Sequence, residues 1–287
     1  MDRNGQTRRR LSPEEDALIL ESRGVACLKN SSAKILLFDI ETAPMRSYLW
    51  SKWQQGINDN AIITDWFILC WSAKWLFSDE ILSSKLNKKE LPKGNDRRIT
   101  KNLWQLMDEA DIIIAHNLMK FDLKKANTKF LQYNLGRPSP FNTIDTLLHA
   151  RKQFAITSNK LDYIAKNFFG IEGKLQTERN LWNRCMEGDM KALQFMSLYC
   201  DQDVRVLEDV YLCMRGWITP HPNVGLQSLS LDGGCNACSS VKRESTKTPY
   251  RTYVSIYDSY RCKNCGHIYR SRRSKKNLGD KGVSLPK

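Results

Sequence analysis

The sequence predicts an α/β domain, built as a mixed sheet flanked by helices, followed by a small module rich in cysteines and basic residues. Two observations predict the domain: short apolar runs typical of buried strands, and amphipathic segments that alternate with such runs in the middle of the chain. Two close pairs of cysteines in a Lys- and Arg-rich C-terminal segment indicate the module. A chain of 287 residues can bury one core of ordinary size and still carry a small appendage.

Three strands open the predicted domain. The apolar run 35–41, followed by Pro44, predicts a buried strand. An aromatic-rich strand is expected over 66–75 and a third strand around 80–82. Because the connections between these runs are short, we expect an antiparallel meander, which ends in a loop at 91–96.

Helices and strands alternate after this loop. The expected elements are, in order, a helix over about 98–109, a strand over 111–115, a helix over about 121–133, a strand near 143–145 and a mainly helical segment from 159 to about 215 that is interrupted at 170–173 and 188. This alternation predicts a mixed sheet flanked by helices.

The predicted domain organisation has five parts. Ser12, Pro13 and Glu15 have the pattern of a helix start, so residues 1–33 are expected to form an N-terminal helical extension. The remaining parts are the α/β domain at 34–217, a Pro-containing linker at 218–230, the cysteine module at 231–274 and a basic tail at 275–287.

Charge indicates the class of partner. The chain has 45 Lys and Arg and 31 Asp and Glu, which gives a net charge of +14. Residues 241–287 contain thirteen of the Lys and Arg residues and only three of the Asp and Glu residues. Such an excess favours nucleic acid as the partner, and a hydrophobic content of 41% excludes a disordered chain. No apolar run approaches the roughly 20 residues of a membrane helix, and the N-terminus lacks a signal peptide's apolar segment. We therefore expect a soluble cytoplasmic protein that is neither secreted nor membrane-bound.

Acidic residues cluster in a way that predicts a metal site. Asp39 and Glu41 lie two apart on the first strand, so their side chains share one face. Asp122 follows the strand at 111–115, while Tyr199 and Asp203 are four apart on one face of a late helix. Adjacent carboxylates repel unless a cation offsets their charge, and oxygen ligands favour Mg²⁺ or Mn²⁺. An isolated Asp-x-Glu also fits a solvated strand end.

Three short segments occur in this order along the chain: Asp39-Ile40-Glu41, Asn117-x3-Phe121-Asp122 and Tyr199-x3-Asp203. They resemble the three motifs of the DEDD 3′–5′ exonucleases, over roughly residues 34–215. The residue before Tyr199 is Leu198, where the histidine subgroup would have its histidine, so the tyrosine subgroup is the better match. The chain is most similar to the proofreading domains of B-family DNA polymerases and to stand-alone, phage-type relatives.

This resemblance implies an RNase H-like fold in which Asp39, Glu41, Asp122 and Asp203 hold two Mg²⁺ or Mn²⁺ ions and Tyr199 orients the attacking water. It implies a metal-dependent 3′–5′ exonuclease that hydrolyses the phosphodiester bonds of DNA by a two-metal mechanism. The expected setting is a bacterial or phage-infected cell, with a polymerase or replication protein as a partner in trans. An RNA 3′–5′ exonuclease would carry the same acids, and a non-catalytic nucleic-acid-binding regulatory protein is the alternative from another class.

Other residues near these motifs have simpler interpretations. Asp145 could reach the metal site, although a strand-end acid is favoured, and His116 is interpreted as a packed or substrate-adjacent residue. Core and flap packing is favoured over base stacking for a group of aromatic residues: Tyr48, Trp50, Trp53, Trp66, Trp71 and Trp75.

The C-terminal cysteines have the spacing of a zinc ribbon. Cys235-x2-Cys238 and Cys262-x2-Cys265 are separated by 23 residues, and four thiolates close one structural Zn²⁺ site with no open position for catalysis. His267 is a possible substitute ligand. Tyrosines and arginines alternate around the second pair, which suits contact with phosphates and bases. The other cysteines are interpreted as small buried apolar groups: Cys27, Cys70, Cys185, Cys200 and Cys213.

Overall fold

The computed structural model describes residues 33–53, 56–171, 177–178, 180–227 and 234–275. The chain divides into two compact units, one formed by Lys34–Leu212 and one that contains Cys213–Lys287. The predicted N-terminal helix and all but the first residue of the predicted basic tail lie outside the described residues. No helix in the described part of the chain is both long and apolar enough to cross a membrane.

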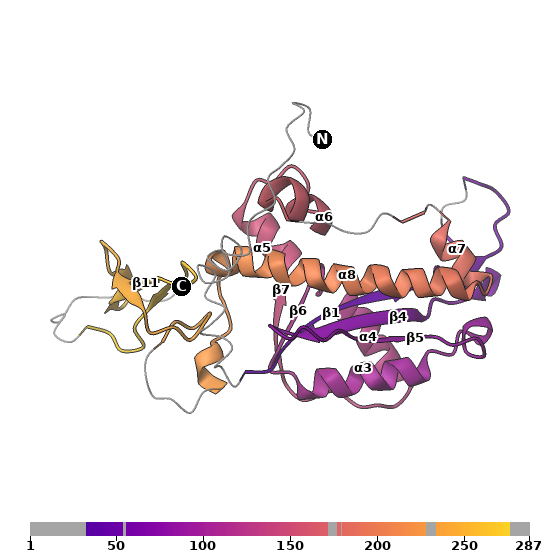
Figure 1. Ribbon diagram of the computed structural model, residues 1–287, viewed down its shortest axis with the longest axis horizontal. Helices are drawn as coiled ribbons and strands as arrows, with labels where there is room; N and C mark the ends of the chain where they lie inside the picture. The colour runs from indigo at the N-terminus through magenta and orange to yellow at the C-terminus, as the bar shows by residue number, and fades with distance from the viewer. Residues whose placement is uncertain (1–32, 54–55, 172–176, 179, 228–233, 276–287) are drawn as a thin grey trace. The chain divides into compact units, whose positions relative to one another are not determined.

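A five-stranded mixed sheet forms the centre of Lys34–Leu212, in the order β5-β4-β1-β6-β7 (Figure 1). The first three strands in sequence, β1 (Ile35–Thr42), β4 (Ile68–Trp75) and β5 (Leu82–Lys85), pair antiparallel, which confirms the predicted meander. Strand β6 (Ile112–Ala115) runs parallel to β1, and β7 (Asn142–Asp145) runs parallel to β6. The predicted fold class, a mixed sheet flanked by helices, is confirmed.

One face of the sheet is covered by helices α3 (Arg97–Glu109) and α4 (Asp122–Gln132). Helix α3 buries Ile99, Leu103 and Met107 at helical spacing, and the Trp71 indole Nε1 donates a hydrogen bond of 2.7 Å to the Ile99 carbonyl. Since the β1 residue opposite Trp71 is Ile40, the even-numbered residues of β1 face α3.

The long helix α8 (Met190–Met214) lies across the other face (Figure 1). Ser72 of β4 donates a hydrogen bond of 2.5 Å to Asp201 of α8, and Lys74 forms an almost fully buried ion pair with Glu208. Ser72 lies opposite Asp39 in the sheet register. The odd-numbered residues of β1 therefore face α8, and coverage of both faces explains why the strand begins as an uninterrupted apolar run.

Helix α5 (Thr146–Gln153) follows β7 directly, in a segment where no helix was predicted. Asp145 begins it, because its carboxylate accepts hydrogen bonds from the amides of Leu147 and Leu148 as an N-cap. The remaining elements of the domain are β2 (Arg46–Ser47), η1 (Asp59–Ala61), β3 (Ile62–Thr64), η2 (Leu91–Lys93), α6 (Leu161–Tyr163), the π-helical η3 (Ile164–Phe169) and α7 (Leu181–Met186).

The aromatic residues separate into two groups. Trp71 is buried, and Trp66 and Trp75 pack against the core, as the packing interpretation predicts. That interpretation is wrong for three residues next to β2, whose exposed fractions are 73%, 97% and 82%: Tyr48, Trp50 and Trp53. They follow β1 and lie in and after the short connection that contains β2.

The C-terminal unit contains short strands. The three-stranded sheet has the order β12-β11-β8, formed by Ile268–Arg270, Ser259–Cys262 and Arg243–Ser245, and β9 (Tyr250–Arg251) pairs with β10 (Ile256–Tyr257). Two 3-10 turns precede these strands, η4 (Arg215–Trp217) and η5 (Val224–Gln227).

The segment before the cysteines is attached to this unit. The Val224 amide donates a hydrogen bond of 2.9 Å to the Asn236 carbonyl, and the Asn236 side chain donates one of 3.1 Å to the His221 carbonyl. A Cβ added to Gly216 would lie 2.3 Å from the Cys265 carbonyl oxygen. Only glycine fits this close approach.

Candidate active site and cysteine cluster

Three of the predicted acids meet between β1 and α8. The carboxylates of Asp39, Glu41 and Asp203 each offer an oxygen, and these oxygens lie within 4.8 Å of one another. Alternation along β1 turns Asp39 and Glu41 to the face covered by α8, where Asp203 is 2% exposed. Carboxylates this close repel each other in a poorly solvated site, so the arrangement suits a divalent cation.

Asp122 lies beside this group, at the edge of β1 that pairs with β6. Ile114 of β6 is opposite Leu37, and β6 ends one residue later, so β1 extends beyond its neighbour. The Ile40 amide there donates a hydrogen bond of 3.3 Å to Asp122 Oδ1. Burial raises the pKa of the Asp122 carboxyl well above its usual range, and the negative charge of Asp39 raises it further.

Tyr199 is half-buried on α8, one helical turn before Asp203. Residues four apart lie on one face of a helix, so the phenol and the carboxylate are presented on the same side. The position of α8 is itself fixed by the contacts of Asp201 with Ser72 and of Glu208 with Lys74.

Cys200 contacts the acidic group although the sequence analysis assigned it only a packing role. Its buried Sγ lies 3.4 Å from both the backbone carbonyl oxygen and the Oδ2 carboxylate oxygen of Asp39. Burial raises the pKa of this thiol well above its usual value, which keeps the S–H donor. The signal available in the sequence was its spacing, because residues 200 and 203 are neighbours on one helix face.

Asp145 and His116 have structural roles. Asp145 is buried at the end of β7, where its two carboxylate oxygens also accept hydrogen bonds from the amides of Asn117 and Met119. The His116 ring hydrogen bonds through Nδ1 to the Thr146 hydroxyl and through Nε2 to the Asn159 carbonyl. Asp145 therefore lies at the strand end, as the favoured interpretation predicts, and His116 is packed by both ring nitrogens; whether His116 is also adjacent to substrate stays a prediction. Both residues shape the loop that leads to Asp122.

The four C-terminal cysteines form the second cluster. Their sulfurs lie within 4.8 Å of one another, with 3.7 Å between Cys235 and Cys265 and 3.5 Å between Cys238 and Cys262. A tetrahedron with metal–sulfur bonds of about 2.3 Å has edges of about 3.8 Å, so the spacing fits one metal ion. His267 is not a member of this cluster, and its Nδ1 lies 3.3 Å from the Gly216 carbonyl oxygen.

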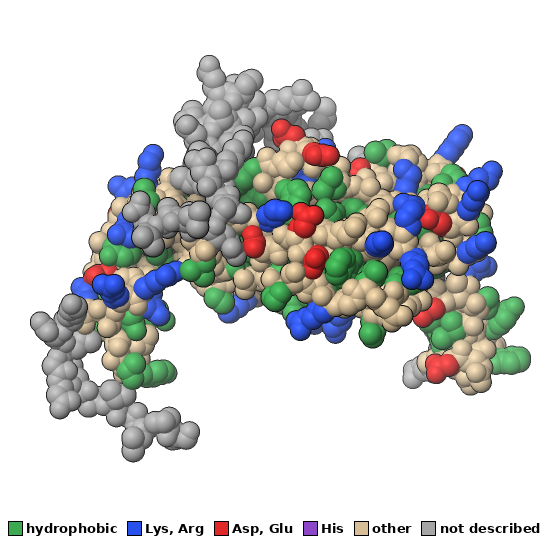
Figure 2. All heavy atoms as spheres, turned by 90° about the horizontal axis from the view of Figure 1, so that it is seen from below, with side chains coloured by type: hydrophobic (Ala, Val, Ile, Leu, Met, Phe, Trp, Pro, Cys, Tyr) green, Lys and Arg blue, Asp and Glu red, His purple; other side chains and the backbone are tan. Residues whose placement is uncertain are grey.

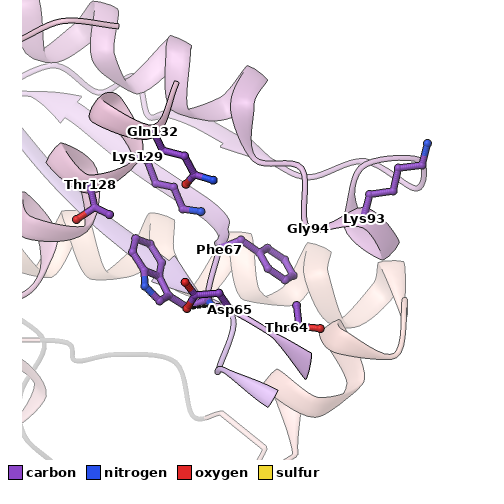
Figure 3. Close-up of a pocket in the computed structure, with 9 residues that line it drawn as sticks. Thr64, Asp65, Phe67, Lys93, Gly94, Thr128, Lys129 and Gln132 are labelled. Carbon is purple, nitrogen blue, oxygen red and sulfur yellow. Dashed lines mark hydrogen bonds between the residues drawn. The ribbon is translucent and has the colours of Figure 1, made fainter. Parts of the chain in front are cut away.

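A separate small pocket of about 180 Å³ lies between α4 and the chain that enters β4 (Figure 3). Lys129 and Gln132 extend into it from α4, and Phe67 lines the opposite side. Lys129 forms a buried ion pair of 3.2 Å with Asp96, and its ammonium lies 4.7 Å from the centre of the Trp66 ring. None of the lining residues is a predicted catalytic residue, and these contacts are those of packing.

The surface of Lys34–Leu212 is of mixed charge. Figure 2 shows Lys and Arg side chains interspersed with acidic ones on its visible face. Residues 34–212 contain 25 Lys and Arg and 22 Asp and Glu, whereas residues 213–287 contain 14 and 4. The excess of positive charge therefore belongs mainly to the C-terminal unit.

Comparison with known proteins agrees with the fold. Residues 79–215 match the family model of the RNase_H superfamily, and this match includes Asp122, Tyr199 and Asp203 but begins after Asp39 and Glu41. No curated protein matches the chain. Proteins of this superfamily are usually nucleases that use divalent metal ions, and the acidic and cysteine groups could both bind metals. With its mixed five-stranded sheet and flanking helices, the domain has an RNase H-like fold, which indicates a nuclease acting on nucleic acid.

Proposed function

We propose that the protein is a metal-dependent 3′–5′ exonuclease that hydrolyses phosphodiester bonds of DNA. A fold alone does not determine an activity, so the proposal depends on the site. The observation that carries it is the convergence of Asp39, Glu41 and Asp203 within 4.8 Å between the central strand and α8. Their order along the chain, with Asp122 and Tyr199, supports the tyrosine subgroup of DEDD exonucleases and a polymerase or replication protein as a partner in trans.

The donor set favours two Mg²⁺ or Mn²⁺ ions as cofactors. Asp39, Glu41, Asp122 and Asp203 would hold them, because hard cations prefer carboxylate oxygens. Bound ions of this kind lower the pKa of water and offset the negative charge that develops on the phosphate.

The protein's own residues position the reactants. Asp39 and Glu41 are fixed by the central strand, and α8 presents Asp203 and Tyr199 from the opposite side. In the proposed reaction, Tyr199 Oη orients the attacking water by a hydrogen bond. The water oxygen forms a bond to the terminal phosphorus while the bond from phosphorus to the preceding 3′-oxygen breaks, which releases a nucleoside 5′-monophosphate.

The cysteine cluster is proposed to bind one structural Zn²⁺. Four sulfur ligands at tetrahedral spacing leave no open position for a substrate or water, so we assign this ion no catalytic step.

Degradation of end-labelled oligonucleotides tests the activity. With Mg²⁺, a 5′-labelled DNA strand should shorten progressively, and a 3′-labelled strand should release its label as a mononucleotide at once. Asp39→Asn and Asp203→Asn should each lower the rate by about 10³-fold or more, since a metal ligand contributes several kcal/mol. The matched control is Asp79→Asn, an exposed acid of the same domain, which should retain the wild-type rate.

Three outcomes would contradict the proposal. Faster hydrolysis of RNA than of DNA of the same sequence would establish the RNA exonuclease instead. Absence of hydrolysis with either substrate would favour the non-catalytic binding protein. A fully active Asp39→Asn protein would remove the acidic group from the mechanism.

A further inference from the structure

A wide groove of about 1160 Å³ runs through the C-terminal unit. It is bounded by residues of β8, β9, β11 and β12 and by the segment that precedes the cysteines. The lining residues include four arginines, Arg243, Arg270, Arg272 and Arg273, and three tyrosines, Tyr250, Tyr260 and Tyr269.

Among the described residues that line the groove, the Lys, Arg, Asp and Glu side chains are represented by arginines alone. All four lining arginines are exposed, and no Asp or Glu is among the described lining residues. Two nearby acids pair with cations that do not line the groove: Glu244 lies 3.9 Å from Arg261, and Asp258 lies 2.9 Å from Lys275. Because its described lining contains arginines and no acidic side chain, the groove suits an anionic ligand.

Aromatic rings hold two of these arginines in place. The Arg243 guanidinium lies 4.2 Å from the centre of the Tyr260 ring, and that of Arg270 lies 3.9 Å from the centre of the Tyr257 ring. A guanidinium stacked on a ring keeps its N–H donors at its edge, where they can bind phosphate oxygens. Tyr250 is 50% exposed at the same groove, so part of its ring is accessible.

The cysteine cluster supports this surface from within the same sheet. Cys262 ends β11, where it pairs with Arg243, and Tyr260 lies two residues earlier on the same face. Tyr260 also lies opposite Tyr269 of β12, with 5.8 Å between the ring centres. The positions of the arginines and tyrosines are thus coupled to the cysteines.

We propose that this groove binds single-stranded DNA. The arginines match the charge of a phosphate backbone, and an accessible tyrosine ring offers a stacking surface that only unpaired bases can use. The choice of DNA rests on the proposed function, and the groove would hold the strand whose end is hydrolysed at the acidic site.

Binding of about 30 nucleotides of oligothymidylate to the full-length, zinc-loaded protein tests the proposal. The affinity is measured between about 50 and 200 mM salt, without Mg²⁺ and without a chelator. The double variant Arg270→Gln/Arg272→Gln should flatten the slope of log affinity against log salt by about 1.4, because each lost contact with a single strand contributes about 0.7.

Matched controls separate the groove from general charge. Arg251→Gln/Arg261→Gln removes two exposed arginines of the same unit that do not line the groove, and its slope should equal that of wild type. Tyr250→Ser should weaken binding about 10-fold and Tyr250→Phe should not, because phenylalanine keeps the ring. Tyr253→Ser, at a fully exposed ring outside the groove, should have no effect. Each variant must contain one zinc per chain.

The proposal is overturned if both double variants change the slope equally, or if neither does. Equal affinity for a duplex of the same length would overturn the single-strand assignment, and tighter binding of RNA through the same arginines would overturn DNA. Because the assay requires no hydrolysis, an inactive acidic site would leave its outcome unchanged.

Discussion

The acidic group and the cysteine cluster both gather potential metal ligands, but they do so by opposite means. The acids come from β1 and α8, separated by more than 160 positions between Asp39 and Asp203, and only the folded sheet brings them together. The cysteines come from two short hooks inside a module of few buried side chains. The acidic group therefore depends on the fold, whereas we expect the fold of the module to depend on its cysteines.

The two units that contain these clusters also differ in their cores and in their charge. Lys34–Leu212 has its own core of strands and helices and nearly balanced charge, while the C-terminal unit carries most of the excess of Lys and Arg. The proposed site for bond cleavage and the proposed surface for binding a strand can thus be altered separately. The following variants test that separation.

The largest effect is expected from loss of the proposed Zn²⁺ ion. Structural Zn²⁺ contributes about 10–16 kcal/mol in small zinc modules, so Cys235→Ser should abolish the ordered structure of the module. The zinc content should fall from one ion per chain to none, and the amides of β11 and β12 should lose their protection from hydrogen exchange. Protection of β1 and β4 should remain, because their core is separate. Equal loss of protection in β1 would show that the two units fold together.

Replacement of the phenol of Tyr199 should have a smaller effect, confined to the acidic site. Tyr199→Phe removes one hydrogen bond to the attacking water, so kcat should fall about 10- to 100-fold while the Mg²⁺ dependence stays unchanged. The measurement is the initial rate on a short oligonucleotide over a Mg²⁺ titration. A shift in the Mg²⁺ midpoint would mean that Tyr199 also positions a metal ligand.

The cysteine cluster could be predicted more fully than the acidic group, because its ligands are close in sequence while those of the acidic group come from distant elements. The two C-x2-C pairs are local sequence patterns, so their spacing alone predicts which four sulfurs lie together. Most strands and helices could be predicted from the spacing of apolar residues. That Asp39 and Glu41 share one face could be predicted from the alternation of side chains along a strand. Contacts between distant elements were not predictable. The spacing of residues 200 and 203 indicates only that they share a helix face, and it does not pair Cys200 with Asp39. The capping role of Asp145, which begins α5, was missed because the residue was considered as a strand-end acid or a metal-site residue and not as an N-cap.

Cys200 gives a more modest test of how the acidic group is held. Cys200→Ala removes the thiol next to the Asp39 carboxylate and with it a weak hydrogen bond of about 1 kcal/mol. If this hydrogen bond helps to hold Asp39 for the metal ion, its loss should raise the Mg²⁺ concentration at half-maximal rate roughly fivefold. Cys200→Ser keeps a donor and should restore most of the wild-type midpoint. An unchanged midpoint in the alanine variant would show that Cys200 only fills space.

The smallest expected effect concerns the stability of the domain without Mg²⁺. Asp122 is buried, and its raised pKa means that the folded state disfavours the charged carboxylate. As the pH rises above the ordinary range of an aspartate, the unfolded chain releases this proton before the folded chain does, so folding becomes less favourable until the pH has passed the folded-state pKa. Asp122→Asn removes this penalty and keeps a carbonyl oxygen that can accept the hydrogen bond from the Ile40 amide.

In zinc-containing buffer without Mg²⁺ or chelator, thermal unfolding followed by circular dichroism should therefore show Asp122→Asn melting above wild type at neutral pH. Each kcal/mol of this penalty corresponds to roughly 2–4 °C in melting temperature for a domain of this size. The difference should disappear below about pH 3, where the carboxyl is protonated in both states. The variant should be inactive although it is more stable at neutral pH. Addition of Mg²⁺ at neutral pH should raise the melting temperature of wild type toward that of the variant, because the ion offsets the buried charge of Asp122. The melting temperature of the variant, which lacks this charge, should not rise in the same way. A variant that melts below wild type at every pH would show that Asp122 stabilises the loop before α4, and would assign it to the fold instead of to the metal site.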